Sequence, residues 1–237
     1  MINASALDNG LHAGDLKFVD LDGNNKIEQT TSANDRKDMK VIGNSLPRYN
    51  YNFGISADWY GIDFSVLFQG IGKQNWYPGA ETSMFWGPYS RPYASFIPSD
   101  FMSQVWSEEN TNAYFPRPRG YVALGSNREL AVVNTKYLQN LAYCRLKNLS
   151  IGYTLPDKWL SKIGFEKIRV YFSGENLLTF TKLHSDYIDP EQASASNSWK
   201  TSKSDANIYP WAKTYSFGVD ITCLLYTSPS PRDYAAS

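Results

Sequence analysis

The stretch RYNYNFGISADWYGIDFSVLFQG, residues 48–70, decides the fold class. Apolar and aromatic side chains occupy every second position in it, first from Tyr49 to Trp59 and then from Ile62 to Phe68. Side chains of a β-strand point alternately to opposite faces, so a period of two predicts two strands, each with an apolar and a polar face. Gly61 separates the two runs and predicts a tight turn. The stretch is therefore expected to form a β-hairpin.

The same alternation returns in three later segments, 143–156, 167–180 and 213–222. In the last of them Tyr215, Phe217 and Val219 alternate with small and polar residues. Helical periodicity is scarce, and no apolar run approaches the roughly 18 residues of a membrane helix. The sequence thus predicts an all-β, antiparallel fold.

Composition narrows the classes of function. The 23 basic and 23 acidic residues cancel, so no global field favours nucleic acid as a partner. Neither Cys144 nor Cys223 belongs to a metal-type pair, and His12 and His184 lack the spacing of metal ligands. No set of nucleophile, base and orienting residue is visible, so we expect a protein that is not an enzyme.

Connection lengths alternate between short and long. The joins at Gly61 and at 156–166 are short, whereas the segments 71–140 and 183–210 are long and irregular. Outer-membrane barrels have this asymmetry, with lipid against the apolar face and a polar lumen. A soluble sandwich would instead cover the apolar face with a second sheet. Two interpretations are therefore open, a transmembrane barrel segment and a secreted or surface β-sandwich that binds glycans.

A series of motifs resembles, in order, the C-terminal part of the SusC/RagA-type TonB-dependent outer-membrane transporters. The motifs are GDLKFVDLDGNNKIE (14–28), VIGNSLPRYNYNFG (41–54), YLQNLAYCRLKNLSIGYTLP (137–156), IRVYFSGENLLTFT (168–181) and YPWAKTYSFGVDIT (209–222). The resemblance implies about six C-terminal strands of a plugged barrel of about 22 strands, with long extracellular loops. It also implies a place in the cell outer membrane, in contact with lipid.

The same resemblance implies partners and cargo. A SusD-like surface lipoprotein would pair with the transporter, and the TonB complex would act through a plug and TonB box that precede this chain. The cargo would be an oligosaccharide or a peptide.

Three regions follow from these patterns. Residues 1–47 are expected to form an extracellular-type loop with a degenerate EF-hand-like stretch, and residues 48–222 the C-terminal barrel strands and loops. Residues 223–237, CLLYTSPSPRDYAAS, break the strand pattern and resemble a translated sequencing adapter. We expect this tail to be non-native, with an aromatic residue in the natural protein where Cys223 stands.

Candidate ligand-binding residues come from the aromatic loop and from the polar strand faces. Sugars stack on tryptophan and tyrosine rings, which makes Trp76, Trp86, Tyr89 and Trp106 candidates for glycan contact. The alternative is that these rings pack the long loop against itself or against the partner lipoprotein. The polar face is expected to turn toward the lumen, and the residues assigned to it are Asp63, Gln69 and Asp220.

The stretch DLDGNNKIE, residues 20–28, resembles the first part of a calcium-binding loop. Asn25 stands where such loops have glycine, and Thr31 stands where they have a bidentate acid. The stretch can therefore be read as a calcium site or as a turn held by its own Asx hydrogen bonds. No cofactor other than calcium is expected. The candidate ligands are Asp20, Asp22, Asn24, the Lys26 carbonyl, Glu28 and Asp35.

Overall fold

The computed structural model describes residues 12–30, 32, 34–90, 97–125, 128–160, 164–196, 203–204 and 209–223. The chain divides into two compact units, which we treat separately. The sheet unit comprises residues 51–69, 144–179 and 212–237, and the loop unit comprises residues 1–50, 70–143 and 180–211. Most of the proposed tail, residues 224–237, lies outside the described residues.

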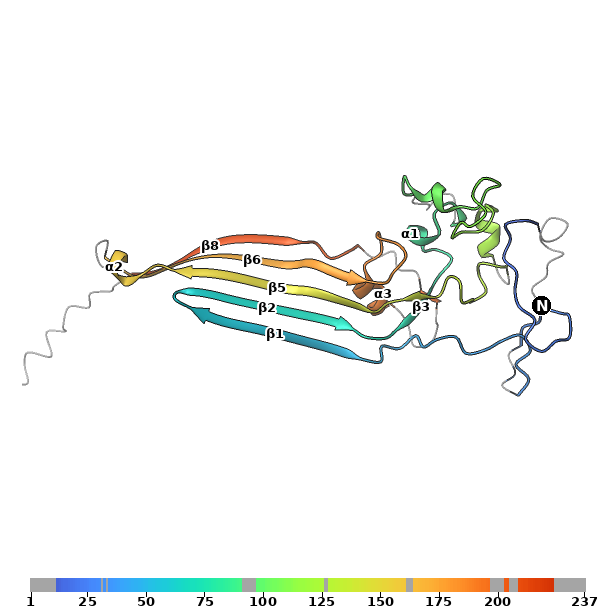
Figure 1. The fold of residues 1–237 in the computed structure, drawn as a ribbon, viewed down its shortest axis with the longest axis horizontal. Helices are drawn as coiled ribbons and strands as arrows, with labels where there is room; N and C mark the ends of the chain where they lie inside the picture. Colours follow the sequence, from blue (N-terminus) through green and yellow to red (C-terminus); the bar gives the residue numbers. More distant parts are fainter. Residues whose placement is uncertain are drawn as a thin grey trace, which may run out of the picture. The chain divides into compact units, whose positions relative to one another are not determined.

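Five long strands form one sheet. They are β1 (Asn50–Trp59), β2 (Ile62–Ile71), β5 (Tyr143–Thr154), β6 (Phe165–Thr181) and β8 (Thr214–Cys223). Their order is β1-β2-β5-β6-β8, so strands that follow one another along the chain are neighbours in the sheet. The strand arrows alternate in direction, which makes the sheet an antiparallel meander (Figure 1). The all-β prediction is confirmed, with five long strands among the described residues instead of about six.

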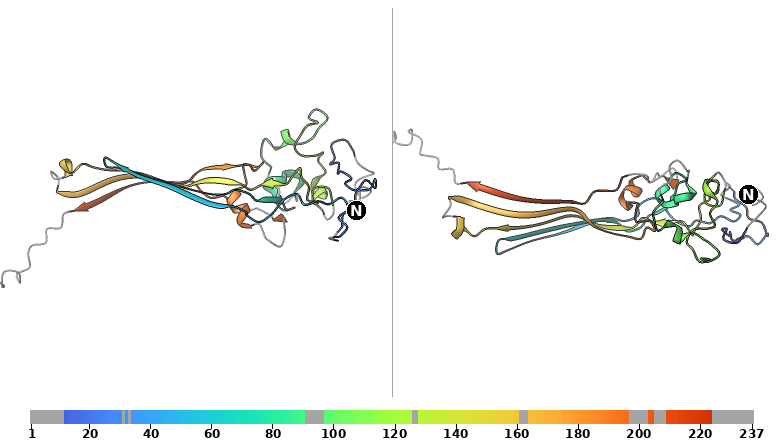
Figure 2. Two further views of the ribbon diagram at one scale, coloured as in Figure 1. Left: turned by 60° about the horizontal axis from the view of Figure 1, so that its bottom comes forward. Right: turned by 90° about the horizontal axis from the view of Figure 1, so that it is seen from above.

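The predicted hairpin turn is confirmed at Gly61. Tyr60 and Gly61 both have positive φ, 47° and 84°, which is the backbone of a two-residue type I′ turn. This turn type matches the right-handed twist of antiparallel strands, and the twist of the sheet is visible in Figure 2. Gly61 also accepts a hydrogen bond from the Thr154 amide at 2.7 Å.

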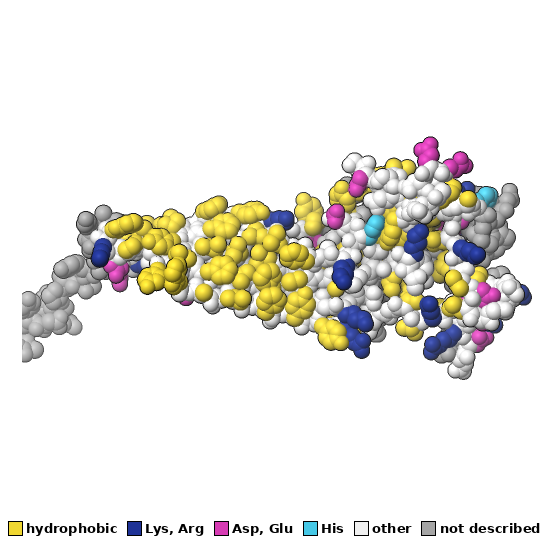
Figure 3. Space-filling view, in the orientation of Figure 1, with side chains coloured by type: hydrophobic (Ala, Val, Ile, Leu, Met, Phe, Trp, Pro, Cys, Tyr) yellow, Lys and Arg dark blue, Asp and Glu magenta, His cyan; other side chains and the backbone are white. Residues whose placement is uncertain are grey.

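Pairing of β6 with β8 separates an apolar from a polar face. Directly opposite pairs on the apolar face are Ile168 with Ile221, Val170 with Val219, and Phe172 with Phe217. The Phe172 and Phe217 rings lie 5.1 Å apart. No described residue of the sheet unit covers this face, and Phe217 is 82% exposed. Apolar side chains gather over the strands in the space-filling view (Figure 3).

The remaining helices and strands are short. The sheet unit has one helical turn, α2 (Asp157–Leu160), between β5 and β6. In the loop unit β3 pairs with β4 and β7, and a few helical turns stabilise the long connections. These elements are β3 (Asn75–Pro78), α1 (Ser83–Trp86), η2 (Gly87–Tyr89), η4 (Phe101–Gln104), η5 (Gly120–Leu124), β4 (Gln139–Asn140), α3 (Pro190–Ser196) and β7 (Lys203–Ser204).

An aromatic core holds the loop unit together. Phe115 lies near its centre, with its ring 4.7 Å from the ring of Phe101 and 5.9 Å from the ring of Tyr137. Phe85 meets Trp86 edge-on at 4.8 Å. Such face and edge contacts stabilise beyond the burial of area alone. The long segment 71–140 is therefore a packed unit with little regular secondary structure.

Candidate functional site

The calcium-like loop is folded around its own side chains. Asp20 accepts hydrogen bonds from the amides of Gly23 and Asn25, each at 2.7 Å. Asn24 Oδ1 accepts one from the Lys26 amide, also at 2.7 Å. Asn25 has φ of 59°, the left-handed conformation that its place in the loop requires. These bonds have the Asx-turn pattern, one of the two interpretations of the sequence.

Asp38 lies outside the stretch 20–28 and binds its backbone at two positions. Its two carboxylate oxygens accept hydrogen bonds from the amides of Leu21 and Glu28, each at 2.7 Å. The amide of Glu28, followed by that of Leu21, holds the pKa of Asp38 below its usual value. Carboxylate oxygens of Asp20, Asp22 and Asp38 lie within 4.8 Å of one another. This group could hold a cation, and calcium binding remains a prediction.

The acid that joins Asp20 and Asp22 is Asp38 and not Asp35, the late acid chosen from the sequence. Asp35 forms an ion pair with Lys37 at 3.3 Å, and the same lysine lies 3.5 Å from Glu28. Asp38 does not stand out in the sequence because it lies well beyond the twelve positions of an EF-hand loop.

Three of the four aromatic candidates are core residues. Trp76, Trp86 and Tyr89 have no exposed surface. The Trp86 indole nitrogen donates to the Gly79 carbonyl at 2.9 Å, and the Tyr89 hydroxyl donates to the Pro116 carbonyl. Burial raises the pKa of Tyr89. A glycan cannot stack on rings whose faces are covered, so the arrangement corrects the ligand-contact assignment for these three residues.

Trp106, the fourth candidate, is partly buried. Its ring lies over Gly14, which has φ of 86°, and a β-carbon at that position would overlap the ring. The glycine therefore provides both the backbone conformation and the space for the indole. Trp106 thus packs against Gly14 within the loop unit.

The polar face of the sheet carries a charged network. Arg169 on β6 donates to both carboxylate oxygens of Asp63 on β2, from Nε at 2.7 Å and from Nη2 at 2.6 Å. Its Nη1 donates to Asp220 on β8 at 3.1 Å. The guanidinium carbon also lies 4.8 Å from the Tyr171 ring centre. Two of the three predicted polar-face residues, Asp63 and Asp220, are thus joined by an arginine that the sequence analysis did not single out.

A glycine makes this network sterically possible. Gly152 on β5 lies between the strands that carry Asp63 and Arg169, and a β-carbon there would lie 2.6 Å from Arg169 Nε. Gln69, the third residue assigned to this face, is exposed on β2. No hydrogen bond to its side chain is found among the described residues.

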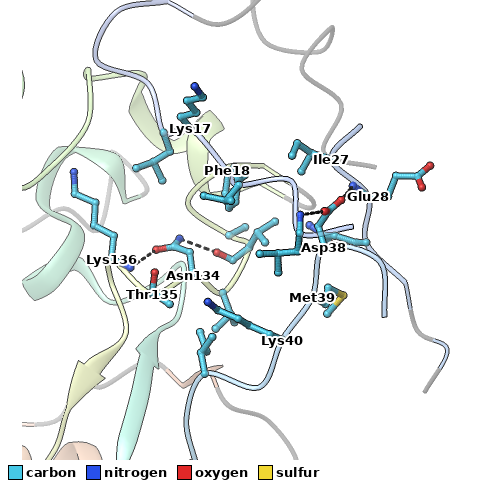
Figure 4. A pocket seen from close by; sticks show the side chains of 18 of the residues that line it. Lys17, Phe18, Ile27, Glu28, Asp38, Met39, Lys40, Asn134, Thr135 and Lys136 are labelled. Carbon is cyan, nitrogen blue, oxygen red and sulfur yellow. Dashed lines mark hydrogen bonds between the residues drawn. The ribbon is translucent and has the colours of Figure 1, made fainter. Parts of the chain in front are cut away.

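A cavity of about 920 Å³ lies within the loop unit, between the calcium-like loop and residues 131–136 (Figure 4). Its volume is near the upper end of ligand pockets, which span about 300–1,000 Å³. Leu16, Val19 and Ile42 are among its apolar lining residues. Sequence reasoning missed this cavity, because its walls come from segments about 100 positions apart.

Known proteins resemble the chain over most of its length. A protein of Formosa agariphila named TonB-dependent receptor P3 is 31% identical over 210 residues, which is 86% of this chain and 18% of that protein. TonB-dependent receptor P26 of the same organism is 25% identical over 226 residues, 93% of this chain and 21% of that protein. The chain belongs to the TonB-dependent receptors. It spans about a fifth of the length of these relatives.

Solved structures agree with this family in fold. The RagAB peptide transporter matches with a TM-score of 0.55 and 22% identity, covering 82% of this chain and 19% of that one. The RagAB importer in its closed-closed state matches with a TM-score of 0.54 and 23% identity, covering 86% of this chain and 20% of that one. No family model matches the receptor chain. Within its described residues, no helix is both long and apolar enough to cross a membrane.

Proposed function

We propose that this chain supplies C-terminal strands and loops of an outer-membrane transporter that imports a nutrient with energy relayed by TonB. The observation that carries the proposal is the 31% identity to a TonB-dependent receptor over 86% of the chain. The apolar sheet face supports it, since Phe217, Val219 and Ile221 are largely exposed and suit contact with lipid. No catalytic step is part of this function.

A surface lipoprotein of the SusD type is the proposed partner. Support comes from the resemblance of the motifs to the SusC/RagA type and from the similarity in fold to the solved RagAB peptide importer. The nutrient is an oligosaccharide or a peptide. TonB itself would act on parts of the receptor that precede the strands described here.

The alternative of a glycan-binding β-sandwich has less support. A sandwich needs two sheets of similar size, packed face to face. Among the described residues, the second sheet consists of strands of two to four residues. The exposed apolar face of the long sheet suits a bilayer better than a solvated surface.

The proposal is tested with the full-length gene in its native host. Deleting the gene should abolish growth on one class of nutrient, supplied as an oligosaccharide mixture or as a peptide digest, while growth on monosaccharides or free amino acids continues. Deleting tonB should give the same selective loss. Purification of the receptor with its partner tests the pairing. Unchanged growth of the deletion strain on every oligomeric nutrient would argue against transport.

A further inference from the structure

Charge is distributed unevenly along the long strands. β1 and β5 begin, and β2 and β6 end, at the same end of the sheet (Figure 1), and these strand ends belong to the loop unit. The register of β6 and β8 places Glu175 opposite Thr214, the first residue of β8. A line across the sheet at this level divides the strands into a loop-side part and a turn-side part.

The loop-side parts, with the residues that join them, contain no carboxylate. Residues 45–53, 68–80, 137–147, 176–185 and 209–213 carry six cations, which are Arg48, Lys73, Arg145, Lys147, Lys182 and Lys213. The turn-side parts, residues 54–67, 148–175 and 214–223, carry six carboxylates and four cations. Positive charge is therefore in excess at the loop side of the strands only.

Three of the six cations form a group that we call the basic collar, Arg48, Lys73 and Lys182. All three are exposed and belong to the loop unit. The Arg48 amide donates to the Lys73 carbonyl at 2.9 Å, so these two residues are cross-strand neighbours. Lys182 follows the last residue of β6 directly.

Hydrogen bonds beyond the strand ends keep the collar residues at one level. The Leu141 amide donates to the Gln74 carbonyl at 3.0 Å, which joins the chain after β2 to the chain before β5. The His184 amide donates to Gln139 Oε1 at 3.2 Å, which joins the chain before β5 to the chain after β6. Since β5 alone separates β2 from β6, the backbones of the two collar lysines lie roughly 10 Å apart, two strand spacings.

The collar cations are free to meet a ligand and adjoin exposed aromatic rings. Within the described part of the chain, none of the three side chains has an ion pair. Tyr49 follows Arg48 and is 59% exposed, and Phe180 precedes Lys182 by two residues and is 61% exposed. Aromatic rings beside lysine and arginine are typical of a membrane interface, where the long cationic side chains reach the headgroups.

From this combination we propose that the basic collar binds the phosphate groups of lipid headgroups in the outer leaflet of the membrane. Arginine donates paired hydrogen bonds to phosphate oxygens, and lysine binds them as a point charge. The rings of Tyr49 and Phe180 would lie at the depth of the headgroups. The inference rests on the proposed function, because it requires that the loop-side ends of the strands reach the outer leaflet.

A lipid fits this surface better than a soluble acidic protein does. The strands that lead to the collar expose apolar side chains up to its base, Phe53 and Tyr51 on β1 and Leu178 and Phe180 on β6. Acyl chains cover such a face in a membrane, whereas a soluble acidic partner would use the charges alone. A molecule with acyl chains attached to a phosphorylated headgroup matches both parts of the surface.

Binding is measured by native mass spectrometry on the full-length receptor in a neutral detergent. The probe is monophosphoryl lipid A, and the matched probe is the same lipid after removal of its phosphate. We expect the phosphorylated lipid to bind at least about tenfold more tightly, because each cation close to an anionic headgroup adds to the attraction. Inorganic phosphate at the same concentration should not displace it, since it has no acyl chains.

Two triple variants assign the site. R48Q/K73Q/K182Q should weaken binding of monophosphoryl lipid A by at least about tenfold and abolish the preference for the phosphorylated form. K17Q/R36Q/K40Q also removes one arginine and two lysines, all exposed on the loop unit, and should leave binding unchanged. The comparison of the two lipids on the unmodified receptor does not depend on the folding of either variant.

Three results would overturn the inference. They are equal binding of the two lipids, equal weakening in both triple variants, and loss of an acidic protein partner from R48Q/K73Q/K182Q while its lipid binding stays unchanged. The growth assay of the deletion strain separates this inference from the transport function. Preference for the phosphorylated lipid with normal growth keeps the collar and removes transport. Selective loss of growth without a lipid preference does the reverse.

Discussion

Arg169 and Asp63 are joined by two hydrogen bonds of 2.7 and 2.6 Å although β5 separates their strands in the sheet. Paired donors from one guanidinium to one carboxylate fix both distance and orientation. The contact therefore links β2 to β6 across an intervening strand, and Asp220 extends the link to β8. We interpret this network as a feature that holds strand alignment.

We predict that single removal of either charge, in D63N or R169Q, lowers the folded fraction of the full-length receptor. The reason is that D63N leaves Arg169 with Asp220 alone, whereas R169Q leaves both carboxylates without the arginine that they share. Folding is measured by the difference in electrophoretic mobility between heated and unheated samples.

The double variant D63N/R169Q should lose less folded protein than the two single variants lose when their losses are added. Such non-additivity indicates that the two residues interact directly. E175Q, on the same strand and at the same face by register, is the control and should fold normally. Strictly additive losses would argue against a direct role of the pair.

Trp86 should be a stability residue. It is fully buried, so W86A is expected to cost about 3–5 kcal/mol of unfolding free energy. W159A, which truncates a tryptophan that is 62% exposed, should change stability little. Denaturant titration of the purified receptor measures both. If W86A changed ligand affinity without changing stability, Trp86 would be a ligand residue after all.

The loop around Asp38 should open in acid. Because hydrogen bonds from the Glu28 and Leu21 amides lower its pKa in the folded state, its stabilising effect is complete above the unfolded pKa, about 3.8–3.9. The effect is lost as pH falls through the lower folded pKa. Hydrogen exchange at the Leu21 and Glu28 amides should therefore accelerate at low pH. D38N should show fast exchange already at neutral pH.

D35N is the matched control for D38N, since Asp35 contacts Lys37 and not the loop amides. Exchange at Leu21 and Glu28 in D35N should follow the unmodified receptor at every pH. Equal acceleration in both variants would show that net charge, and not the Asp38 hydrogen bonds, holds the loop.

Metal removal tests the other interpretation of the same loop. Since Asp20 and Asn24 already satisfy backbone amides within it, we expect chelation with EDTA to leave the exchange rates of Gly23 and Asn25 unchanged. Repeating the measurement with added calcium provides the comparison. Protection that appears only with calcium would establish a metal site formed by Asp20, Asp22 and Asp38.

Position 223 should control membrane insertion. Cys223 is the last residue of β8, lies opposite Phe165, and continues the apolar series of Val219 and Ile221. In the full-length gene, C223F with the chain stopped at that residue should increase the amount of receptor in the outer membrane. T222F, which places the aromatic ring on the opposite face, should not. Equal insertion of the receptor with and without residues 224–237 would contradict this prediction.

Features that depend on local periodicity could be predicted from the sequence. Features that depend on contacts between distant segments could not. Ile168, Val170 and Phe172 could be assigned to one face because alternation along a strand requires no knowledge of its neighbours. Gly61 indicated its turn for the same reason. Asp38 could not be found in this way, because its hydrogen bond to Leu21 spans 17 positions.

The aromatic residues of the long loop illustrate a second limit of prediction from sequence. A tryptophan in a proline-rich segment has the same appearance in sequence whether its ring is covered or open to a ligand. Trp86 is covered because Phe85, Phe115 and Tyr137 surround it, and those neighbours come from three parts of the segment. The cavity could not be predicted for the same reason, since its walls come from distant segments.

Gly152 has a consequence for reading natural variation among these receptors. Exchange of glycine for alanine is usually counted as a mild change, yet one methyl group here would displace the side chains of Asp63 and Arg169. Its effect would resemble that of deleting a charge on an adjacent strand. Orthologues with a larger residue at this position should therefore lack one of the two charged partners, a co-variation that can be sought in aligned genes.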